Sequence, residues 1–251
     1  MSVSLRDYLF HAEPGITLYC GDCRDVLPLL EAPADLLLTD PPYAVSKSGV
    51  GRWEMRYGRT DDLDFFDGDT DWPAMTRTVL EAVNLAVRKL EKHGSAYMWL
   101  GHRQFGPVAA DLEAAGWSTR FLVWSKVCPV PPAPGSGWPS AAELCLYAYR
   151  PGRRWAYSGV PPMRSNVLLA DGYRHGNPGK VDHPTQKPLA VLTPLIEAST
   201  SDGDTVLDPF VGSGSTLIVA KNLGRSAIGI EIEPRYCEIA VKRLRQEVLA
   251  L

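Results

Sequence analysis

The chain has 251 residues, of which 45% are hydrophobic and 22% charged, and its formal net charge is −3. Aromatic residues make up 9% of it, which excludes a disordered chain and fits one large globular domain. No stretch approaches the ~18 apolar residues that a membrane span needs, and the N-terminus lacks a basic region leading into an apolar run. We therefore expect a cytoplasmic protein with no membrane partner.

Short apolar runs alternate with helical patterns along most of the chain. Strands are predicted at 16–20, 35–39, 95–100, 119–125, 143–149, 205–207 and 227–230, and helices at 25–30, 72–90, 104–115, 188–199, 215–223 and 235–249. The strand at 35–39 is nearly uniformly apolar, which is typical of a strand covered on both faces. Strands that alternate with helices predict right-handed crossovers, and therefore an α/β fold with a doubly wound, mostly parallel sheet.

Two stretches interrupt this rhythm. The segment 45–71 is rich in Gly, Arg and Asp, and the segment 129–182 lacks periodicity apart from the strand at 143–149. The Pro- and Gly-rich run from Cys128 to Gly137 predicts no regular structure. Irregular stretches of this length inside a compact domain are usually functional or disordered.

The charges are unevenly distributed. From 150 to 187 the chain carries seven basic residues against two aspartates, and a second basic group at 52–59 precedes six aspartates at 61–71. These groups are either solvated surface or two segments that contact phosphates, and charge alone does not separate the two interpretations. The basic residues are Arg52, Arg56, Arg59, Arg150, Arg153, Arg154, Arg164, Arg174, Lys180 and Lys187.

The five cysteines are an odd number in a large chain, which argues against a disulfide framework. Cys20-Gly-Asp-Cys23 has the spacing of half a zinc site, but the sequence contains no second pair to complete it. Small buried thiols are the better interpretation of the two.

A Gly-rich turn follows the strand at 205–207. It reads Asp208-Pro-Phe-Val-Gly-Ser-Gly-Ser-Thr216 and leads into a helix, whose first N–H groups can bind an anionic group. Leu217 takes the position of the third glycine in the dinucleotide fingerprint, which disfavours a nicotinamide cofactor. Glu231 ends the next strand, where an acid can accept hydrogen bonds from ribose hydroxyls. The alternative is an acid at a helix start, but the pairing of Glu231 with the Gly-rich turn favours a nucleoside site.

A second motif, Asp40-Pro41-Pro42-Tyr43, follows the strand at 35–39 directly. Ligands of open α/β sheets bind at the carboxyl ends of the strands, so this motif is expected beside the Gly-rich turn. The prolines stiffen the turn, Asp40 and the Pro41 carbonyl offer acceptors, and Tyr43 offers a stacking face. This set suits a planar heterocycle with an exocyclic amine; the alternative is a rigid turn with a capping aspartate.

Together the two motifs resemble the signatures of S-adenosylmethionine-dependent DNA methyltransferases that modify exocyclic amines. Their order, with the Asp-Pro-Pro-Tyr motif first and the Gly-rich turn near the C-terminus, is similar to that of the circularly permuted beta group, whose core is Rossmann-like. The resemblance implies that the catalytic residues are Asp40, Pro41, Pro42 and Tyr43. It implies that the cofactor S-adenosylmethionine contacts Asp22, Thr185, Lys187, Asp208, Phe210, Gly212, Ser213, Gly214 and Glu231.

Three further segments carry the resemblance, which covers most of the chain. Gly21-Asp22 matches the position that contacts the adenine of the cofactor, and His183–Pro188 matches the segment that helps hold its methionine end. Phe121–Lys126 resembles the strand segment that helps line the target-base pocket. The family then implies three parts: a catalytic half at 1–128 with a loop insertion at 45–71, a target-recognition region at 129–182, and a cofactor-binding half at 183–251.

The implied reaction is methyl transfer to an adenine N6 amine in double-stranded DNA, because Asp before Pro-Pro-Tyr resembles the adenine-modifying members more than the cytosine-modifying ones. The base must be flipped out of the duplex; Tyr43 then stacks on it, Asp40 orients its amine, and no metal is needed. The alternatives are cytosine-N4 methylation, methylation of RNA or of a protein glutamine, and a non-catalytic DNA-binding remnant. Many members of the family form dimers, so a homodimer is an expectation of the resemblance.

Overall fold

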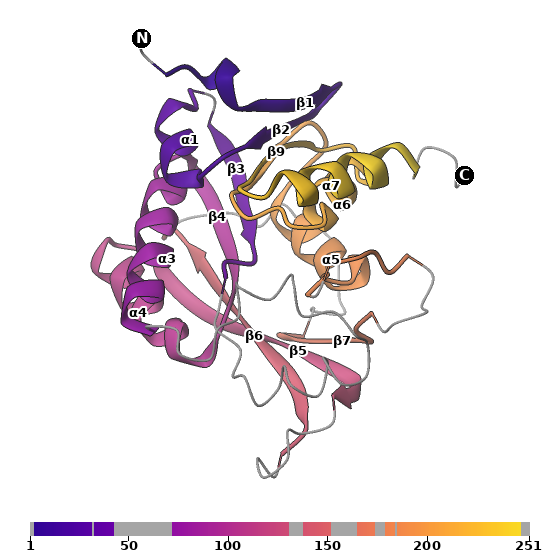
Figure 1. Ribbon diagram of the computed structural model, residues 1–251. Helices are drawn as coiled ribbons and strands as arrows, with labels where there is room; N and C mark the ends of the chain where they lie inside the picture. The colour runs from indigo at the N-terminus through magenta and orange to yellow at the C-terminus, as the bar shows by residue number, and fades with distance from the viewer. Residues whose placement is uncertain are drawn as a thin grey trace.

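The computed structural model describes residues 3–31, 33–42, 72–130, 138–151, 165–173, 179–183 and 185–246. The strands are β1 (Leu9–Glu13), β2 (Ile16–Cys20), β3 (Ala34–Thr39), β4 (Leu90–Leu100), β5 (Ser118–Val130), β6 (Ser140–Tyr149), β7 (Val167–Ala170), β8 (Thr205–Asp208) and β9 (Ser226–Glu231). The helices are the short 3₁₀ helix η1 (Leu5–Tyr8), α1 (Cys23–Leu29), α3 (Trp72–Val87), α4 (His102–Ala114), α5 (Leu189–Ser199), α6 (Ser215–Asn222) and α7 (Pro234–Gln246). The strands form one nine-stranded sheet in the order β1-β2-β9-β8-β3-β4-β6-β5-β7 (Figure 1).

The central strands of this sheet are parallel. β2, β9, β8, β3 and β4 run in one direction, whereas β1 and β6 are antiparallel to their neighbours. In β3, Leu36, Leu37 and Leu38 are each at most 1% exposed, as expected for a strand with both faces covered. The structure therefore contains the doubly wound, mostly parallel sheet that the sequence predicts.

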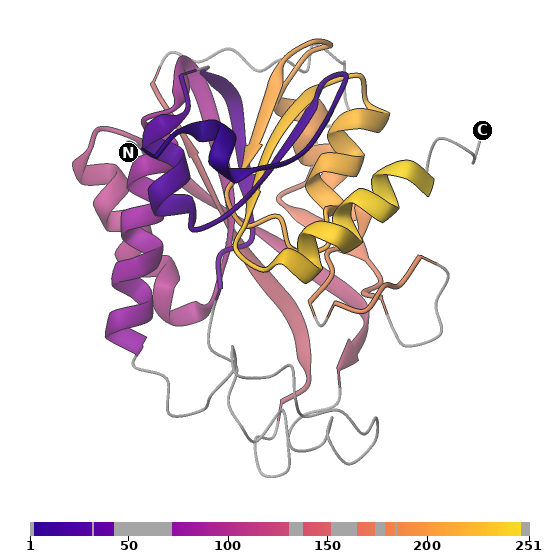
Figure 2. The same ribbon diagram turned by 45° about the horizontal axis from the view of Figure 1, so that its top comes forward.

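Helices cover both faces of the sheet, with α1, α3 and α4 on one face and α5, α6 and α7 on the other (Figure 2). Alternate residues of β3 point into the two layers. Leu37 shares a core cluster with Val79 and Val83 of α3, whereas Leu36 and Leu38 belong to the cluster on the side of α5, α6 and α7. None of the helices in the described ranges is long and apolar enough to cross a membrane.

The strands depart from the prediction in several places, and β4 begins at Leu90 instead of 95 and β6 at Ser140 instead of 143. β5 continues through Val130 into the run predicted as irregular, because Val130 pairs with Ser140 of β6 in a long hairpin. β7 lies within the segment 129–182 and pairs in parallel with β5, and β1 pairs with β2 at the opposite edge of the sheet. Both edge strands are short and mix exposed with partly buried residues, so they lack the apolar run that predicts a strand. The predicted loop at 45–71 lies outside the described residues.

The sheet brings the two sequence motifs together at its carboxyl edge, where the central parallel strands end. β3 and β8 are parallel neighbours, so Asp40 and the Gly-rich turn follow adjacent carboxyl ends. Thr39 Oγ1 donates a hydrogen bond to Asp208 Oδ1 at 2.8 Å and joins the two strand ends directly. At the same edge, the N–H of Gly21 after β2 donates to the carbonyl oxygen of Glu231 in β9 at 2.9 Å. Ligands of open α/β sheets bind at such an edge.

Candidate active site

A cavity of about 250 Å³ opens at this edge of the sheet. Both sequence motifs line it, together with the start of α1 and the segment that precedes α5. Gly214 faces α7 instead of the cavity, and Tyr43 lies outside the described residues. The predicted site residues that line the cavity are Asp22, Asp40, Pro41, Pro42, Thr185, Lys187, Asp208, Phe210, Gly212, Ser213 and Glu231.

The Gly-rich turn after β8 has two residues in the left-handed region, Gly212 (φ +51°) and Gly214 (φ +84°). A Cβ on Gly214 would lie 2.8 Å from the Cβ of Ala240, so α7 packs directly against the turn. A Cβ on Gly212 would lie 2.7 Å from Nε2 of His183. Both positions need glycine for the backbone conformation and for close approach, and Gly212 leaves the backbone of the turn open to the cavity.

His183 packs between this turn and Tyr236, and the two ring centroids lie 4.6 Å apart in an edge-on arrangement. Burial, together with nearby cationic side chains, lowers the pKa of His183 to about 3, so the ring is neutral near pH 7. Its Nδ1 is buried and has no hydrogen-bond partner among the described residues. A neutral imidazole with an unpartnered nitrogen therefore lines the cavity beside Gly212.

α7 contributes a buried charge that sequence reasoning missed. Arg243 is 6% exposed, and its guanidinium donates to the carbonyl oxygen of Ser213 at 2.6 Å and to Oγ of Ser215 at 3.1 Å. Arg243 thereby braces the Gly-rich turn from behind. A basic residue near the end of an amphipathic helix is ordinarily interpreted as exposed. The one sign in the sequence that Arg243 is buried is its position on the apolar face of the helix, with Ala240 and Leu244.

Glu231 ends β9 beside the turn. Its Oε2 accepts the N–H of Gly212 at 2.7 Å, and its Oε1 accepts the N–H of Glu233 at 2.9 Å. Burial raises the pKa of this carboxyl above its usual value, and the backbone donors oppose that effect. Each carboxylate oxygen has more than one acceptor position, so Glu231 can bind the turn and a ligand hydroxyl together.

Asp208 makes its hydrogen bonds to other residues of the protein. It is 2% exposed, and its Oδ1 accepts the hydroxyl of Thr39 at 2.8 Å and the N–H of Phe210 at 3.0 Å. Burial raises the pKa of Asp208 to about 6. Its hydrogen bonds shape the turn and join it to β3.

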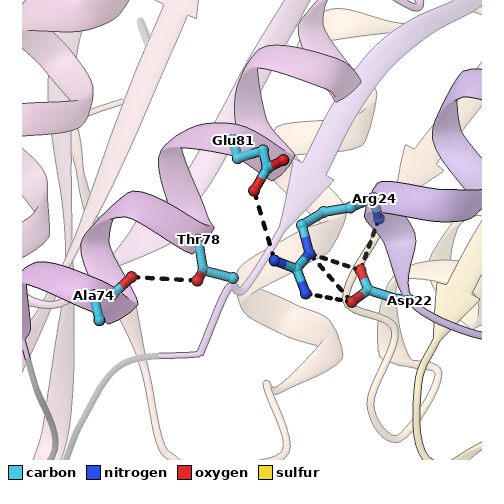
Figure 3. A network of polar contacts seen from close by, with 5 residues as sticks. All are labelled: Asp22, Arg24, Ala74, Thr78 and Glu81. Carbon is cyan, nitrogen blue, oxygen red and sulfur yellow. Dashed lines mark hydrogen bonds and ion pairs between the residues drawn. The ribbon is translucent and has the colours of Figure 1, made fainter.

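Asp22 caps α1 (Figure 3), and it is also one of the residues that line the cavity. Its carboxylate accepts the backbone N–H of Arg24 at 2.8 Å and pairs with the Arg24 guanidinium at 2.6 Å, which also reaches Glu81 of α3 at 3.6 Å. Hydrogen bonds from Arg24 hold the pKa of Asp22 below its usual value. Asp22 is thus an ionised acceptor in a fixed position. The adjacent Cys23 is a buried free thiol.

Asp40 lines the same cavity at the end of β3. Its Oδ2 accepts a hydrogen bond from Nζ of Lys187 at 2.7 Å. Its Oδ1 is buried and has no hydrogen-bond partner in the described part of the chain. Burial raises the pKa of Asp40 to about 6, although Lys187 opposes the shift. One oxygen of this carboxylate is paired with Lys187, and the other is a buried acceptor that has no partner among the described residues.

The sequence predicts Lys187 as a cofactor contact, and the structure places it in a buried charge network. Its side chain is 6% exposed, and Nζ lies 2.7 Å from Oδ2 of Asp40 and 3.0 Å from Oε2 of Glu143. Oε1 of Glu143 in turn pairs with Nζ of Lys126 at 2.8 Å. Nζ of Lys187 also lies 5.4 Å from the ring centroid of Trp99, a contact within the range of cation–π attraction.

Two residues that support Asp40 escaped sequence reasoning. Glu143 is the single charged residue of β6, and that isolation in an apolar strand is the signal that could have found it. Gln104 of α4 is fully buried, and its amide donates to the carbonyl oxygen of Pro42 at 3.0 Å. It holds the Pro-Pro corner from the side of α4, and no motif marks it.

The segment Phe121–Lys126 lies behind the cavity wall. Trp124 is buried and packs edge-on against Trp99 at 6.3 Å between ring centroids, and Trp99 is the one of the two that lines the cavity. Phe121 is 55% exposed. The segment thus supports the wall through Trp99.

Three of the seven basic residues counted between 150 and 187 lie in the described ranges, and each of the three has contacts within the protein. Arg150 stacks over Trp117 at 4.6 Å from the ring centroid, and Lys180 donates to the carbonyl oxygen of His183. Lys187 is buried, so neither interpretation of that charge group, solvated surface or phosphate contact, applies to it. Outside the described residues lie Arg52, Arg56, Arg59, Arg153, Arg154, Arg164, Arg174 and the six aspartates at 61–71.

The fold and the site together define a class of protein, the nucleoside-dependent transferases with a Rossmann-like core. Its features here are the doubly wound α/β sheet, the Gly-rich turn with an acid after the next strand, and the Asp-Pro-Pro corner on the same cavity. The family model N6_N4_Mtase, described as DNA methylase, matches residues 34–242. The chain belongs to this DNA methylase family.

Relatives and solved structures agree with this assignment. The type II methyltransferase M2.DpnII of Streptococcus pneumoniae is 30% identical over 85% of this chain and 83% of its own length. The type II methyltransferase M.HpaI of Haemophilus parainfluenzae is 31% identical over 92% of this chain and 74% of its own length. The crystal structure of the M1.HpyAVI–SAM complex is 26% identical and covers 91% of this chain and 100% of that chain, with a TM-score of 0.69. The prediction of an S-adenosylmethionine-dependent methyltransferase of the N6/N4 type is confirmed.

Proposed function

We propose that this DNA methylase transfers a methyl group from S-adenosylmethionine to the N6 amine of an adenine in double-stranded DNA. The observation that carries the proposal is the state of Asp40: Lys187 holds one carboxylate oxygen, and the other has no partner among the described residues. An acceptor held in this way on the cavity wall suits an exocyclic amine, which donates N–H groups. Asp before Pro-Pro-Tyr also resembles the adenine-modifying members of the family.

The residues of the cavity fit the methyl donor. Carboxylates of Asp40, Asp208 and Glu231 line it, and such an acidic lining suits a cationic sulfonium group. In the proposal Glu231 accepts hydrogen bonds from the ribose, and the backbone at Gly212 with the neutral His183 holds the amino-acid end. When bound, S-adenosylmethionine supplies an electrophilic methyl group.

The target base has to leave the duplex to reach the cavity, which costs a few kcal/mol of unpairing and unstacking. In the proposal Tyr43 stacks on the flipped base, an interaction worth about 1–3 kcal/mol per base. Tyr43 lies outside the described residues, and its role is inferred from its place directly after Pro42, which lines the cavity.

Asp40 acts on the target amine. The lone pair of that amine is delocalised into the ring, so the amine is a poor nucleophile. Hydrogen bonds from its N–H groups to Oδ1 of Asp40 and to the Pro41 carbonyl favour a pyramidal nitrogen with a free lone pair. Gln104 and Lys187 hold this corner in place, so little reorganisation is needed when the methyl group is transferred. Asp40, with a pKa of about 6, can then accept the proton that the methylated amine loses.

Cytosine-N4 methylation is the second candidate, because the family model covers N6 and N4 amines and the same acceptor serves both. We further propose that the enzyme acts in the cytoplasm, and that it forms a homodimer, as the family resemblance implies. Light scattering of the purified protein measures its mass and tests the dimer.

The identity of the methylated nucleoside tests the proposed function. Duplex DNA is incubated with the protein and S-adenosylmethionine, digested to nucleosides and analysed by mass spectrometry against N6-methyladenine and N4-methylcytosine standards. We expect N6-methyladenine from the wild type. N4-methylcytosine in its place would contradict the adenine assignment, and methylated RNA or protein without methylated DNA would contradict the DNA substrate.

A further inference from the structure

Four side chains of alternating charge form a chain of ion pairs that ends at the candidate acceptor Asp40. Lys126 pairs with Glu143 at 2.8 Å, Glu143 with Lys187 at 3.0 Å, and Lys187 with Asp40 at 2.7 Å. Lys187 is 6% exposed, Lys126 is 12% exposed, and Glu143 is 22% exposed. The two lysines and the two carboxylates balance formally.

The sheet topology assembles this chain. β6 is antiparallel to β4, so the start of β6 reaches the edge where the parallel strands end, and Cys145 of β6 pairs with Trp99 of β4. Glu143 precedes Cys145 by two residues and pairs with Trp124 of β5, which brings Lys126 to the same edge. Lys187 comes from the segment directly before α5. Charges from four separate segments thus meet beside the cavity.

Charge balance alone does not require Glu143. Asp40 would by itself neutralise Lys187, and burying Glu143 with Lys126 adds two more charges that must be removed from water. What the second pair adds is a fixed position for the ammonium group. Glu143 is a second anchor for Nζ of Lys187, and the same ammonium meets Oδ2 of Asp40 while Oδ1 has no partner among the described residues.

We propose that Glu143 is a positioning residue for methyl transfer: it anchors Lys187 on Oδ2 of Asp40 and thereby reserves Oδ1 for the target amine. The inference rests on the proposed role of Asp40 as the amine acceptor. It holds for an adenine or a cytosine amine alike, since both donate N–H groups to the same oxygen.

The groups that face Asp40 set the direction of the pH test. Lys187 lowers the pKa of Asp40, whereas burial and Glu143 raise it; Asp208 and the buried Cys145 thiol are the other titratable groups near it. Removing the charge of Glu143 therefore lowers the pKa of Asp40, and removing that of Lys187 raises it. Methyl transfer that needs the Asp40 carboxylate increases as pH rises through this pKa. The acid limb of the rate profile should move to lower pH in Glu143→Gln and to higher pH in Lys187→Met.

The matched control is Glu13→Gln. Glu13 pairs with Lys221 at 2.6 Å and is 21% exposed, close to the 22% of Glu143, but it joins β1 to α6 away from the cavity. Tritiated-methyl transfer to duplex DNA is measured for the wild type and the variants between pH 5 and pH 9. Calorimetry gives the Kd for S-adenosylmethionine, and thermal unfolding checks that each variant is folded.

We expect Glu143→Gln to lower kcat about tenfold, the loss of one hydrogen bond to a charged group, with the Kd for S-adenosylmethionine changed less than about twofold. Glu143→Asp keeps the negative charge but has a shorter side chain, so it should lower kcat while the acid limb of the rate profile moves little. If Glu143→Gln does not fold, Glu143→Asp tests the inference in its place. A kcat and an acid limb equal to those of Glu13→Gln would overturn the inference. Failure of this inference can be distinguished from failure of the proposed function, because the proposed function is tested by the methylated nucleoside that the wild-type enzyme produces.

Discussion

The two sides of the cavity are built in different ways. The centre of the proposed cofactor side, the Gly-rich turn with Glu231, comes from one stretch of chain, and its main contact joins the N–H of Gly212 to a carboxylate 19 residues away. The target side joins Asp40 to Lys187 across 147 residues of sequence, and Glu143 adds a third segment. The cofactor side therefore depends on backbone conformation, and the target side depends on paired side-chain charges.

This difference predicts different consequences of substitution. A left-handed backbone is readily adopted by glycine but costs other residues free energy, so changes in the turn should reduce stability and cofactor affinity. A buried charge is tolerated only while it is paired, so changes around Asp40 should reduce the rate of transfer while the cofactor still binds. Four substitutions separate these outcomes, from the largest expected effect to the smallest.

Asp40→Asn should have the largest effect on the reaction. The amide keeps the shape of the side chain but removes the negative charge of the carboxylate that accepts the hydrogen bond of the target amine. The value of kcat should therefore fall about 100- to 1,000-fold, as for the loss of a preorganised electrostatic group. The Kd for S-adenosylmethionine should stay close to that of the wild type. Tritiated-methyl transfer and calorimetry measure the two quantities. Near-normal turnover would show that Asp40 is only a turn residue.

Gly214→Ala should mainly destabilise the protein. The left-handed backbone costs an alanine roughly 1–2 kcal/mol, and the contact with Ala240 of α7 adds about 1–3 kcal/mol of overpacking. The matched control is Gly203→Ala, since Gly203 has φ +86° against +84° for Gly214 and no atom within 4 Å of the added Cβ. Urea unfolding should therefore show a larger loss for Gly214→Ala than for Gly203→Ala. Equal losses would mean that α7 does not constrain the turn.

Glu231→Gln should weaken the cofactor side without unfolding the protein. An amide has one oxygen where the carboxylate has two, so it cannot accept the N–H groups of both Gly212 and Glu233. Glu231 is also the proposed acceptor of the ribose hydroxyls, and losing that charge-assisted hydrogen bond corresponds to about 1.5–3 kcal/mol, or about a 10- to 100-fold rise in the Kd for S-adenosylmethionine measured by calorimetry. Glu238→Gln, an exposed position of α7, is the control and should leave that Kd unchanged.

Arg24→Met should have the smallest effect. Arg24 pairs with Asp22 at the rim of the cavity, but its side chain is 40% exposed, and exposed ion pairs contribute less than about 1 kcal/mol. The Kd for S-adenosylmethionine should therefore rise less than about fivefold. A loss as large as that of Glu231→Gln would show that the side chain of Asp22 must be held by Arg24 to bind the cofactor.

Much of this protein is determined by its sequence locally. The apolar run of β3, the Gly-rich turn before α6 and the Pro-Pro corner after Thr39 each specify their own conformation through burial, missing Cβ atoms and fixed φ angles. The order of the two motifs then indicates the family, and both line one cavity at the edge where parallel strands end.

The tertiary structure alone decided which charges meet. Lys187 has the appearance of a surface base or a cofactor ligand in the sequence, and only the pairing of β4, β6 and β5 places Glu143 and Lys126 beside it and Asp40. Arg243 likewise becomes a brace because α7 packs against the Gly-rich turn. Backbone conformation depends on neighbours in the chain, whereas the partner of a buried charge depends on which strands and helices lie side by side.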